Sequence, residues 1–395
     1  MKPSSKYFSQ IKLFDNGSNR YSLPSDYEPV RPDFLDINHI YLAKGSISTP
    51  ERKRFVERVC SLYPDVTITE CLETPHNRIN LNVTGELNLH QAGKKSLVFG
   101  ELGNAVRFSE EKGNTCPNYW HFSPYGFCPY GCKYCYLAGT QGVKLSPTVK
   151  IFINLPEILA QVNDIANQFN KPTAFFLGKL QDALALDPLT AYSSKLIPFF
   201  AMHPIARMTL LTKSTNIDHL VRINHNGHTI FSWSVNPPEV CDIFEENVPS
   251  TEDRLQAMYR VAAAGYRVRG MLMPLIPIDG WEHIYSRFIE HLLTAVPLER
   301  LTIGGICIYS AARKIMEHKM ELHNAISVNV ESKTRQQGDG RVRYTEALRV
   351  NMYSLIIKTV RKIKPDLGLA LCMEDQHIWL KLGLEDNIGR CNCVL

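Results

Sequence analysis

Three cysteines in one short segment are the residues of this 395-residue chain whose type and spacing point most directly to chemistry. Cys128, Cys132 and Cys135 follow the spacing C-x3-C-x2-C, and an aromatic residue, Tyr136, comes directly after the last of them. Three thiolates can hold three irons of a [4Fe–4S] cluster, because such clusters are bound through cysteine sulfur. The fourth iron then has no protein ligand and is open to a small molecule. The spacing therefore predicts an iron–sulfur cluster with one open iron.

Two other uses of these cysteines fit the sequence less well. A structural zinc site usually has four ligands in a closed tetrahedron, often as two C-x2-C pairs, and no second pair lies near this segment. A disulfide would leave one of the three thiols over. Gly126, Pro129 and Gly131 suit a loop that bends sharply and brings its backbone close to sulfur.

The segment is identified as the signature of the radical SAM superfamily. An open iron can chelate the amino and carboxylate groups of S-adenosylmethionine (SAM) and pass it one electron, which cleaves SAM to methionine and a 5′-deoxyadenosyl radical. The resemblance implies an enzyme with two cofactors, a [4Fe–4S] cluster and SAM. It also implies an electron donor of the flavodoxin or ferredoxin type.

Composition predicts a soluble, cytoplasmic protein that does not contact membranes. Hydrophobic residues make up 44% of the chain, but no apolar run reaches the ~18 residues of a membrane helix. The first six residues lack an apolar signal core. An odd number of cysteines, 11, favours metal and thiol chemistry over disulfides. The net charge of +5 permits an anionic partner without requiring one.

The elements that must position the cysteine loop alternate between strands and helices. Strands are expected after the loop at 149–153, 173–177, 207–212, 229–235, 266–273 and 301–309. Helices are expected between them at 156–168, 193–202, 217–224, 250–264 and 281–295. Repeated strand–helix units of this size imply a parallel sheet. We therefore expect an α/β fold, a partial (β/α)6 TIM-type barrel, with its active site at the C-terminal ends of the strands.

Four regions are expected along the chain. They are an extended N-terminal arm (1–38), a β-α-β extension (39–110), the barrel with its cluster loop (111–310) and a C-terminal α/β segment (311–395). The last region contains a turn signal at 337–340 between two β-like stretches. Basic residues surround this turn: Lys333, Arg335, Arg341 and Arg343. With Tyr344 as the only aromatic nearby, the pattern favours a solvated hairpin, and nucleic acid stays a candidate substrate.

The order of motifs over roughly residues 39–310 resembles the spore photoproduct lyase family within the radical SAM enzymes. The matching segments are 96–100 (Ser-Leu-Val-Phe-Gly), 135–137 (Cys-Tyr-Leu), 211–213 (Leu-Thr-Lys), 219–220 (His-Leu), 232–236 (Ser-Trp-Ser-Val-Asn), 254–255 (Arg-Leu), 264–266 (Ala-Gly-Tyr), Pro274 and 279–281 (Asp-Gly-Trp).

The resemblance assigns roles toward SAM to individual residues. Tyr136 would lie beside the adenine, and Tyr134 is also expected in the cofactor site. Ser234 and Asn236 would contact the ribose or the methionine part, and Lys213 would pair with the carboxylate. These roles agree with elementary chemistry, because a carboxylate favours a cation and ribose hydroxyls favour short polar side chains. The alternatives are a solvated lysine and a buried capping serine.

One position departs from the family pattern. The lyase returns a hydrogen atom to its product from a cysteine a few residues before an acidic residue. Aligning that acidic residue with Asp182 places Lys179 at the donor position. An ammonium group cannot donate a hydrogen atom to a carbon radical, because its N–H bonds are too strong. The resemblance thus implies a paralogue that keeps the SAM chemistry and acts on another substrate.

The C-terminal tail holds a second cysteine motif, Cys391-x-Cys393, about 20 residues after Cys372. The tail thiols are candidate catalytic residues in two ways. They could supply the hydrogen atom that Lys179 cannot, or they could bind a second metal or a soft acceptor such as arsenite, to which a piece of SAM is transferred. They could also be structural, since cysteine is a common core residue. A function of another class, a nucleic-acid-binding protein with a structural or redox-sensing cluster, also stays open.

Overall fold

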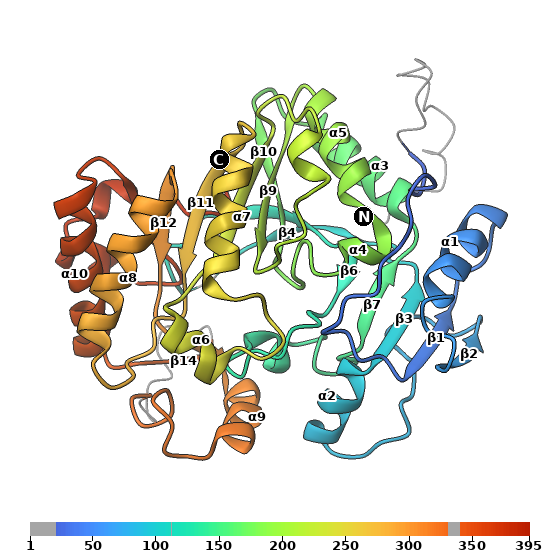
Figure 1. Cartoon of the computed structure of the whole chain (residues 1–395), viewed down its shortest axis with the longest axis horizontal. Helices are drawn as coiled ribbons and strands as arrows, with labels where there is room; N and C mark the ends of the chain where they lie inside the picture. The colour runs from blue at the N-terminus through green and yellow to red at the C-terminus, as the bar shows by residue number, and fades with distance from the viewer. Residues whose placement is uncertain (1–20, 112, 331–339) are drawn as a thin grey trace.

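The computed structural model describes residues 21–111, 113–330 and 340–395. Two larger sheets lie side by side, and helices pack around them (Figure 1). One sheet has the strand order β2-β1-β3-β7-β6, and the other has the order β15-β12-β11-β10-β9-β8-β5-β4. Within these described ranges, no helix is both long and apolar enough to cross a membrane.

The N-terminal sheet contains the predicted β-α-β unit. Strand β1 (His39–Ala43) pairs in parallel with β2 (Thr67–Cys71) and with β3 (Ser96–Gly100). Helix α1 (Pro50–Cys60) connects β1 to β2 and begins after Thr49, whose side chain accepts the N–H of the third residue of the helix. The described part of the N-terminal arm packs on this helix, where the N–H of Leu23 donates to Glu51 at 2.9 Å.

Strand β7 (Val149–Phe152) corrects one expectation. It follows the cysteine loop, as predicted, but it pairs with β3 of the N-terminal sheet and not with the barrel strands. Its other neighbour is the short strand β6 (Tyr125–Gly126), which precedes the cysteine loop. A fully buried strand can pair in either sheet, because its apolar pattern is the same in both. Strands β6 and β7 therefore attach the cysteine loop to the N-terminal sheet.

The second sheet is the predicted partial barrel. Six strands after the cysteine loop run parallel in it: β8 (Thr173–Leu177), β9 (Ala206–Thr212), β10 (Thr229–Ser234), β11 (Arg267–Leu272), β12 (Arg300–Ile303) and β15 (Gly368–Leu371). The sixth strand, β15, comes from the C-terminal segment and takes the place expected for β7. Before the loop, β5 (Tyr119–Phe122) adds parallel to β8, and β4 (Val106–Ser109) adds antiparallel to β5. The sheet stays open, with β15 at one edge and β4 at the other.

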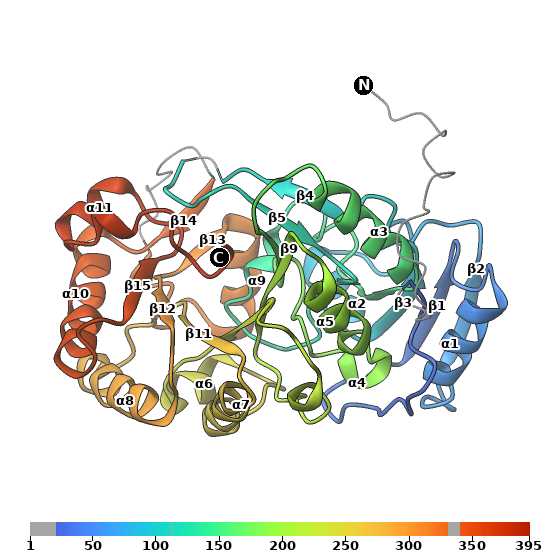
Figure 2. The ribbon, with the colours of Figure 1, turned by 90° about the horizontal axis from the view of Figure 1, so that it is seen from above.

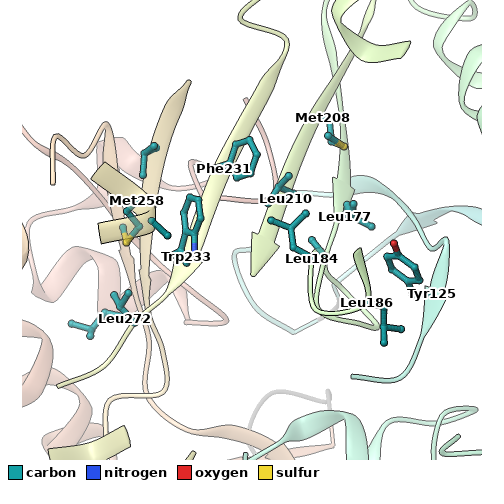
Figure 3. Close-up of a cluster of buried hydrophobic side chains, with 14 of the residues drawn as sticks. Tyr125, Leu177, Leu184, Leu186, Met208, Leu210, Phe231, Trp233, Met258 and Leu272 are labelled. Atoms are coloured by element: carbon teal, nitrogen blue, oxygen red, sulfur yellow. The ribbon is translucent and has the colours of Figure 1, made fainter. Parts of the chain in front are cut away.

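Helices cover the outer, apolar face of the barrel sheet (Figures 1 and 2). They are α3 (Leu155–Ala166), α4 (Asp187–Thr190), α5 (Ser193–Met202), α6 (Pro238–Phe244), α7 (Thr251–Ala263) and α8 (Trp281–Ala295). Leu210 of β9 and Phe231 of β10 are register partners in the buried core that Figure 3 draws. Successive side chains alternate across a sheet, so Thr209 and Ser232, their sequence neighbours, belong to the opposite, inner face. The inner face of the barrel is therefore partly polar.

Two expected elements differ from the structure. Residues 217–224 form only a short 3-10 turn, η3 (Leu220–Arg222). In the preceding segment the hydroxyl oxygens of Thr212 and Ser214 accept the backbone N–H groups of Ser214 and Asn216. Such local bonds compete with a helix. The strand expected at 301–309 is interrupted at Gly304 and Gly305, so β12 ends at Ile303 and β13 (Cys307–Tyr309) starts a separate pair. A Cβ on Gly304 would lie 3.0 Å from the sulfur of Met273.

The C-terminal segment continues with α9 (Ser310–Met320), β14 (Arg341–Arg343), α10 (Glu346–Ile363) and α11 (Gln376–Lys381). Strand β14 pairs antiparallel with β13. The turn of the predicted basic hairpin, with Lys333 and Arg335, lies outside the described residues. Arg343 is buried and donates to the carbonyl of Met373, so this part of the hairpin is not the solvated surface that the charge pattern suggested. The four-region division of the chain stays a prediction.

Candidate active site

The cysteine loop is fixed by backbone contacts from two other elements. It runs from β6 to the 3-10 turn η2 (Tyr136–Gly139). Lys94, at the end of the helix α2 (Glu86–Lys94), donates from Nζ to the carbonyls of Cys128 and, at 2.6 Å, Tyr130. On the other side, the N–H of Gly131 donates to the carbonyl of Glu246 at 2.9 Å. A Cβ at Gly131 would lie 2.9 Å from the Cβ of Glu246, so the loop approaches this segment as closely as only glycine allows.

The three loop cysteines are partly buried neighbours. Burial raises the pKa of Cys128 to about 12, and it raises the pKa of Cys132 as well, while Lys213 acts in the opposite direction. Each thiol is close enough to the others to influence them electrostatically. Among the described residues, no three His, Cys, Asp or Glu side chains are arranged around a single ion. A [4Fe–4S] cluster needs no such arrangement, since each cysteine binds its own iron. The donor set therefore fits a cluster.

Lys213 and Ser234 meet beside Tyr134 of the cysteine loop. The roles of these three residues toward SAM stay a prediction. Lys213 Nζ donates to Ser234 Oγ at 2.7 Å and lies 5.6 Å from the centre of the Tyr134 ring. Lys213 and Ser234 follow or end the neighbouring strands β9 and β10. The C-terminal ends of parallel barrel strands lie at the same edge, and this brings the two side chains together. Asp182 holds the backbone here by accepting the N–H of Lys213 at 2.7 Å.

Glu245 is a central residue that the sequence analysis missed. Its side chain is 1% exposed, it lies 3.5 Å from Lys213 Nζ, and it also pairs with Arg254 and accepts the hydroxyl of Tyr134. Burial alone would raise the pKa of Glu245, but Lys213 and Arg254 hold it below its usual value. Burial alone would lower the pKa of Lys213, and Glu245 raises it above its usual value. Both groups are therefore charged at neutral pH. The pair Glu245-Glu246 follows α6 without any motif that could have marked it.

Asn236 lies behind this group and is fully buried. Its Nδ2 donates to the carbonyl of Pro274 at 3.2 Å, and its Oδ1 accepts the hydroxyl of Tyr285 at 3.1 Å. Both ends of the amide thus have protein partners. In this structure Asn236 supports the segment after β10, and its contact with SAM stays a prediction.

Tyr136 and Lys179 occupy the next part of the site. The hydroxyl of Tyr136 donates to the carbonyl of Lys179, while the Tyr136 side chain is partly exposed. Lys179 Nζ points to Glu111 at 2.9 Å, donates to Ser109 and lies 5.2 Å from the centre of the Tyr119 ring. The lysine at the expected hydrogen-donor position is therefore tied into an ion pair beside two tyrosines.

Glu111 connects this part of the site to the C-terminal segment. Arg341 Nη2 lies 3.2 Å from Glu111 and 3.1 Å from the hydroxyl of Tyr309. Burial alone would raise the pKa of Glu111, but its bonds to Lys179 and Arg341 lower it. Arg341, one of the basic residues predicted around the hairpin turn, thus forms an ion pair with Glu111 of the site.

The C-terminal tail lies across the inner face of the barrel, and the chain end returns to these strands (Figure 2). Asn392, fully buried, accepts from Thr302 and donates to the carbonyl of Gly270, both at 2.9 Å. Thr209 donates to the carbonyl of Cys393 at 3.2 Å. The thiol of Cys393 is near enough to Tyr119 and Tyr136 to affect the pKa of each. The fold therefore places the tail motif on the inner face of the barrel.

Comparisons with known proteins agree with this geometry. The family model described as spore photoproduct lyase matches residues 36–363. A spore photoproduct lyase of Geobacillus sp. (strain Y412MC61) is 31% identical over 270 residues, which cover 67% of this chain and 76% of that protein. A spore photoproduct lyase of Bacillus subtilis (strain 168) is 30% identical over 228 residues, or 57% of this chain and 64% of that protein.

The solved structures show the same relationship in three dimensions. A spore photoproduct lyase complexed with dinucleoside spore photoproduct superimposes with a TM-score of 0.73 at 25% identity, covering 86% of this chain and 99% of that chain. A variant lyase with bound AdoMet and dinucleoside spore photoproduct shares the fold, with a TM-score of 0.73 at 24% identity and the same coverage. The family-model match covers the N-terminal sheet, the cysteine loop and the barrel sheet up to its last strand, β15, so this chain belongs to the spore photoproduct lyase family of radical SAM enzymes.

Proposed function

We propose that this enzyme binds a [4Fe–4S] cluster through Cys128, Cys132 and Cys135 and binds SAM beside it. When bound, the cluster and SAM supply a 5′-deoxyadenosyl radical by one-electron reductive cleavage. The observation that carries the proposal is the adjacency of the partly buried loop cysteines to the Lys213–Ser234–Tyr134 group, in a family whose solved members include one with bound AdoMet.

The chain's own residues have distinct roles in this proposal. Lys213, held by Ser234 and by Glu245 at 3.5 Å, supplies the cation for the SAM carboxylate. Tyr136, partly exposed, offers its ring to the adenine. Asp182 fixes the backbone of Lys213, and Lys94 fixes the loop backbone at Tyr130. These groups orient the cofactors and keep water away from the loop thiols.

Reconstitution under anaerobic conditions tests the cofactor proposal. The wild type should bind about four irons per chain and form 5′-deoxyadenosine from SAM with dithionite. Replacing Cys128, Cys132 and Cys135 together by Ala should abolish both, whereas Cys60→Ser, a matched control on α1, should change neither. Iron binding and SAM cleavage that persist in the triple variant would overturn the ligand assignment.

We infer that the substrate of this enzyme differs from that of the lyases, or that its product forms by another route. Lys179 replaces the expected hydrogen donor, and its ammonium is engaged with Glu111 at 2.9 Å. The tail thiols Cys391 and Cys393 are proposed to act after SAM cleavage, since the tail lies on the inner face of the barrel, where Thr209 donates to the carbonyl of Cys393 at 3.2 Å. With Cys391→Ser and Cys393→Ser combined, the iron content should stay at the wild-type value. Loss of iron in that variant would show that the cluster ligands were assigned too narrowly.

The electron donor is proposed to be an acidic carrier of the flavodoxin or ferredoxin type. A cavity of about 690 Å³ lies next to the cysteine loop, and its lining includes Pro129, Gly131, Lys94, Lys95 and Lys319. Lys319 is close enough to Cys132 and Cys135 to interact with them electrostatically. A positive surface this near the cluster suits a negatively charged protein.

Charge reversal separates docking from chemistry. Lys319→Glu should slow SAM cleavage driven by reduced flavodoxin and leave cleavage driven by dithionite unchanged, while Lys358→Glu on α10 should affect neither. Equal rates for the wild type and Lys319→Glu with flavodoxin would place the donor elsewhere.

A further inference from the structure

The cavity of about 690 Å³ beside the cysteine loop is large enough for a ligand of its own, since sites for small molecules usually span about 300–1,000 Å³. Its walls come from α2, from Pro129 and Gly131 of the loop, and from Lys319 in the last turn of α9. Helices α2 and α9 lie near each other at one end of the molecule (Figures 1 and 2). Among the described residues in these walls, none is one that we propose to bind SAM. The cavity is therefore separate from the proposed SAM site.

Lys94, in the wall that α2 provides, keeps part of its bonding capacity for a ligand. An ammonium group has three N–H donors, and two of those of Lys94 are used by the carbonyls of Cys128 and Tyr130. Its Nζ also lies 4.3 Å from the centre of the Phe127 ring. These partners are uncharged, and no carboxylate pairs with Lys94 within the described ranges. Lys94 thus offers one N–H donor and an unbalanced positive charge.

The remaining charges of the walls leave a second cation unbalanced. Lys319 has no ion pair in the part of the chain that the structure describes. The other two charged side chains in the described walls are already paired. Lys95 lies 3.0 Å from Asp36, and Glu246 lies 3.2 Å from Lys133. The cavity therefore has two ammonium groups that repel each other, and an anion between them would stabilise both.

His90 of α2 adds a polar group without a partner to the same wall. Its side chain is 4% exposed, and neither ring nitrogen has a hydrogen-bond partner among the described residues. The ring packs edge-on against Phe127, with the ring centres 5.5 Å apart. Burial, together with Lys94 and Lys319, lowers the pKa of His90 to about 3, so the neutral ring has one N–H donor. A turn about its side-chain torsions would direct this donor to a ligand, and buried polar groups seldom stay without partners.

A phosphate group matches these donors better than a carboxylate does. A phosphate monoester carries about −1.5 to −2 charges at neutral pH and has three strong acceptor oxygens. A carboxylate has a single charge and two oxygens. Two ammonium groups and one ring N–H supply two positive charges and at least three donors. Lysine binds phosphate as a point charge, without the planar geometry that arginine requires.

We propose that this cavity binds a phosphate group through Lys94 and Lys319, with His90 as a further donor. The group is either free phosphate or the phosphate of a small molecule, and these two sources share the same recognition chemistry. The inference goes beyond the proposed function, since neither the cluster nor SAM takes part in it. It has one consequence for the proposed electron donor, because a bound phosphate neutralises lysines that would attract an acidic carrier.

The test measures binding to the reconstituted enzyme, anaerobic and saturated with SAM so that the anion does not reach the open iron. Three arms at constant ionic strength use inorganic phosphate, glycerol 2-phosphate and acetate, each followed by isothermal titration calorimetry. We expect one phosphate group per chain in at least one of the first two arms and no binding of acetate. Tighter binding of the ester identifies a phosphorylated small molecule as the ligand, and binding of inorganic phosphate alone identifies the free ion.

Matched variants locate the binding in the cavity. Lys319→Gln should weaken phosphate binding at least tenfold, whereas Lys358→Gln, an exposed lysine on α10, should leave it unchanged. His90→Phe keeps a ring against Phe127 and removes two nitrogens without partners. It should weaken phosphate binding at least threefold without lowering the urea midpoint, whereas a purely structural histidine would lower the midpoint. Iron content checks that the cysteine loop is intact, and if His90→Phe loses iron, Lys319→Gln decides the result.

Two results would overturn the inference: phosphate binding no stronger than that of acetate, or equal phosphate binding by the wild type and Lys319→Gln. Either one leaves the proposed function standing, because SAM cleavage depends on the three loop cysteines. Phosphate that binds as expected should also slow cleavage driven by flavodoxin and not cleavage driven by dithionite. Bound phosphate without this effect would count against the proposed donor site alone, and an enzyme that binds phosphate but does not cleave SAM would refute only the proposed function.

Discussion

Replacing Lys213 tests whether the group beside the cysteine loop binds the carboxylate of SAM. Lys213 Nζ lies 2.7 Å from Ser234 Oγ and 3.5 Å from Glu245. Glu245 also pairs with Arg254, and both of these side chains are 1% exposed. In Lys213→Met the carboxylate of Glu245 therefore keeps a buried cationic partner. We expect the variant to fold and to lose mainly its affinity for SAM.

The magnitude follows from the type of contact. A hydrogen bond to a charged group contributes about 1.5–3 kcal/mol. At 1.4 kcal/mol per factor of ten, the dissociation constant for SAM should rise about 10- to 150-fold. Methionine keeps the length and the apolar body of the side chain, so that loss of packing is minimised. Isothermal titration calorimetry with the reconstituted enzyme measures the change.

Two controls make the measurement specific. Lys53→Met removes a lysine that is 61% exposed and pairs with Glu57 at 3.9 Å on α1, so it should leave SAM affinity unchanged. Iron content measured for each variant separates loss of SAM binding from loss of the cluster. If Lys213→Met binds SAM as tightly as the wild type with full iron content, Lys213 does not hold the carboxylate.

Three further predictions concern the substrate and the charged groups around the site. Incubated with dinucleoside spore photoproduct, the reconstituted enzyme should form 5′-deoxyadenosine but should not return two thymidines cleanly, because Lys179 cannot donate a hydrogen atom; clean turnover in a chromatographic assay would refute this. Glu245→Gln leaves Arg254 and Lys213 buried without a carboxylate partner. Urea denaturation should therefore show that the free energy of unfolding falls by about 3–5 kcal/mol. A fall below about 1 kcal/mol would count against the buried network. Burial alone would lower the pKa of His219, but its bond to Asp187 raises it. The stabilisation from this pair should therefore be complete below pH ~6.5 and should fade as pH rises through the higher folded pKa. His219→Gln should flatten that part of the stability curve, and an unchanged slope would refute the assignment.

Local pattern alone was enough to predict several features of this protein. The three cysteines proposed as cluster ligands lie within eight consecutive positions, so their spacing alone indicates the chemistry before any fold is known. Helix starts at Thr49 and Ser250 follow from side chains that accept backbone N–H groups three residues on. The alternation of strands and helices predicted the parallel barrel, since each unit buries its apolar face against its neighbours.

Tertiary structure alone decided the rest. The apolar sequence of strand β7 is that of any buried strand. Its pairing with β3 shows that it belongs to the N-terminal sheet and not to the barrel. Glu245 becomes a site residue because the segment after α6 folds against the cysteine loop. The bond from Thr115 to the carbonyl of Glu374 depends on the tertiary fold, because no local pattern relates segments separated by more than 250 residues. Spacing along the chain determines which groups can act together within a loop, whereas packing of distant elements determines which loops share a site.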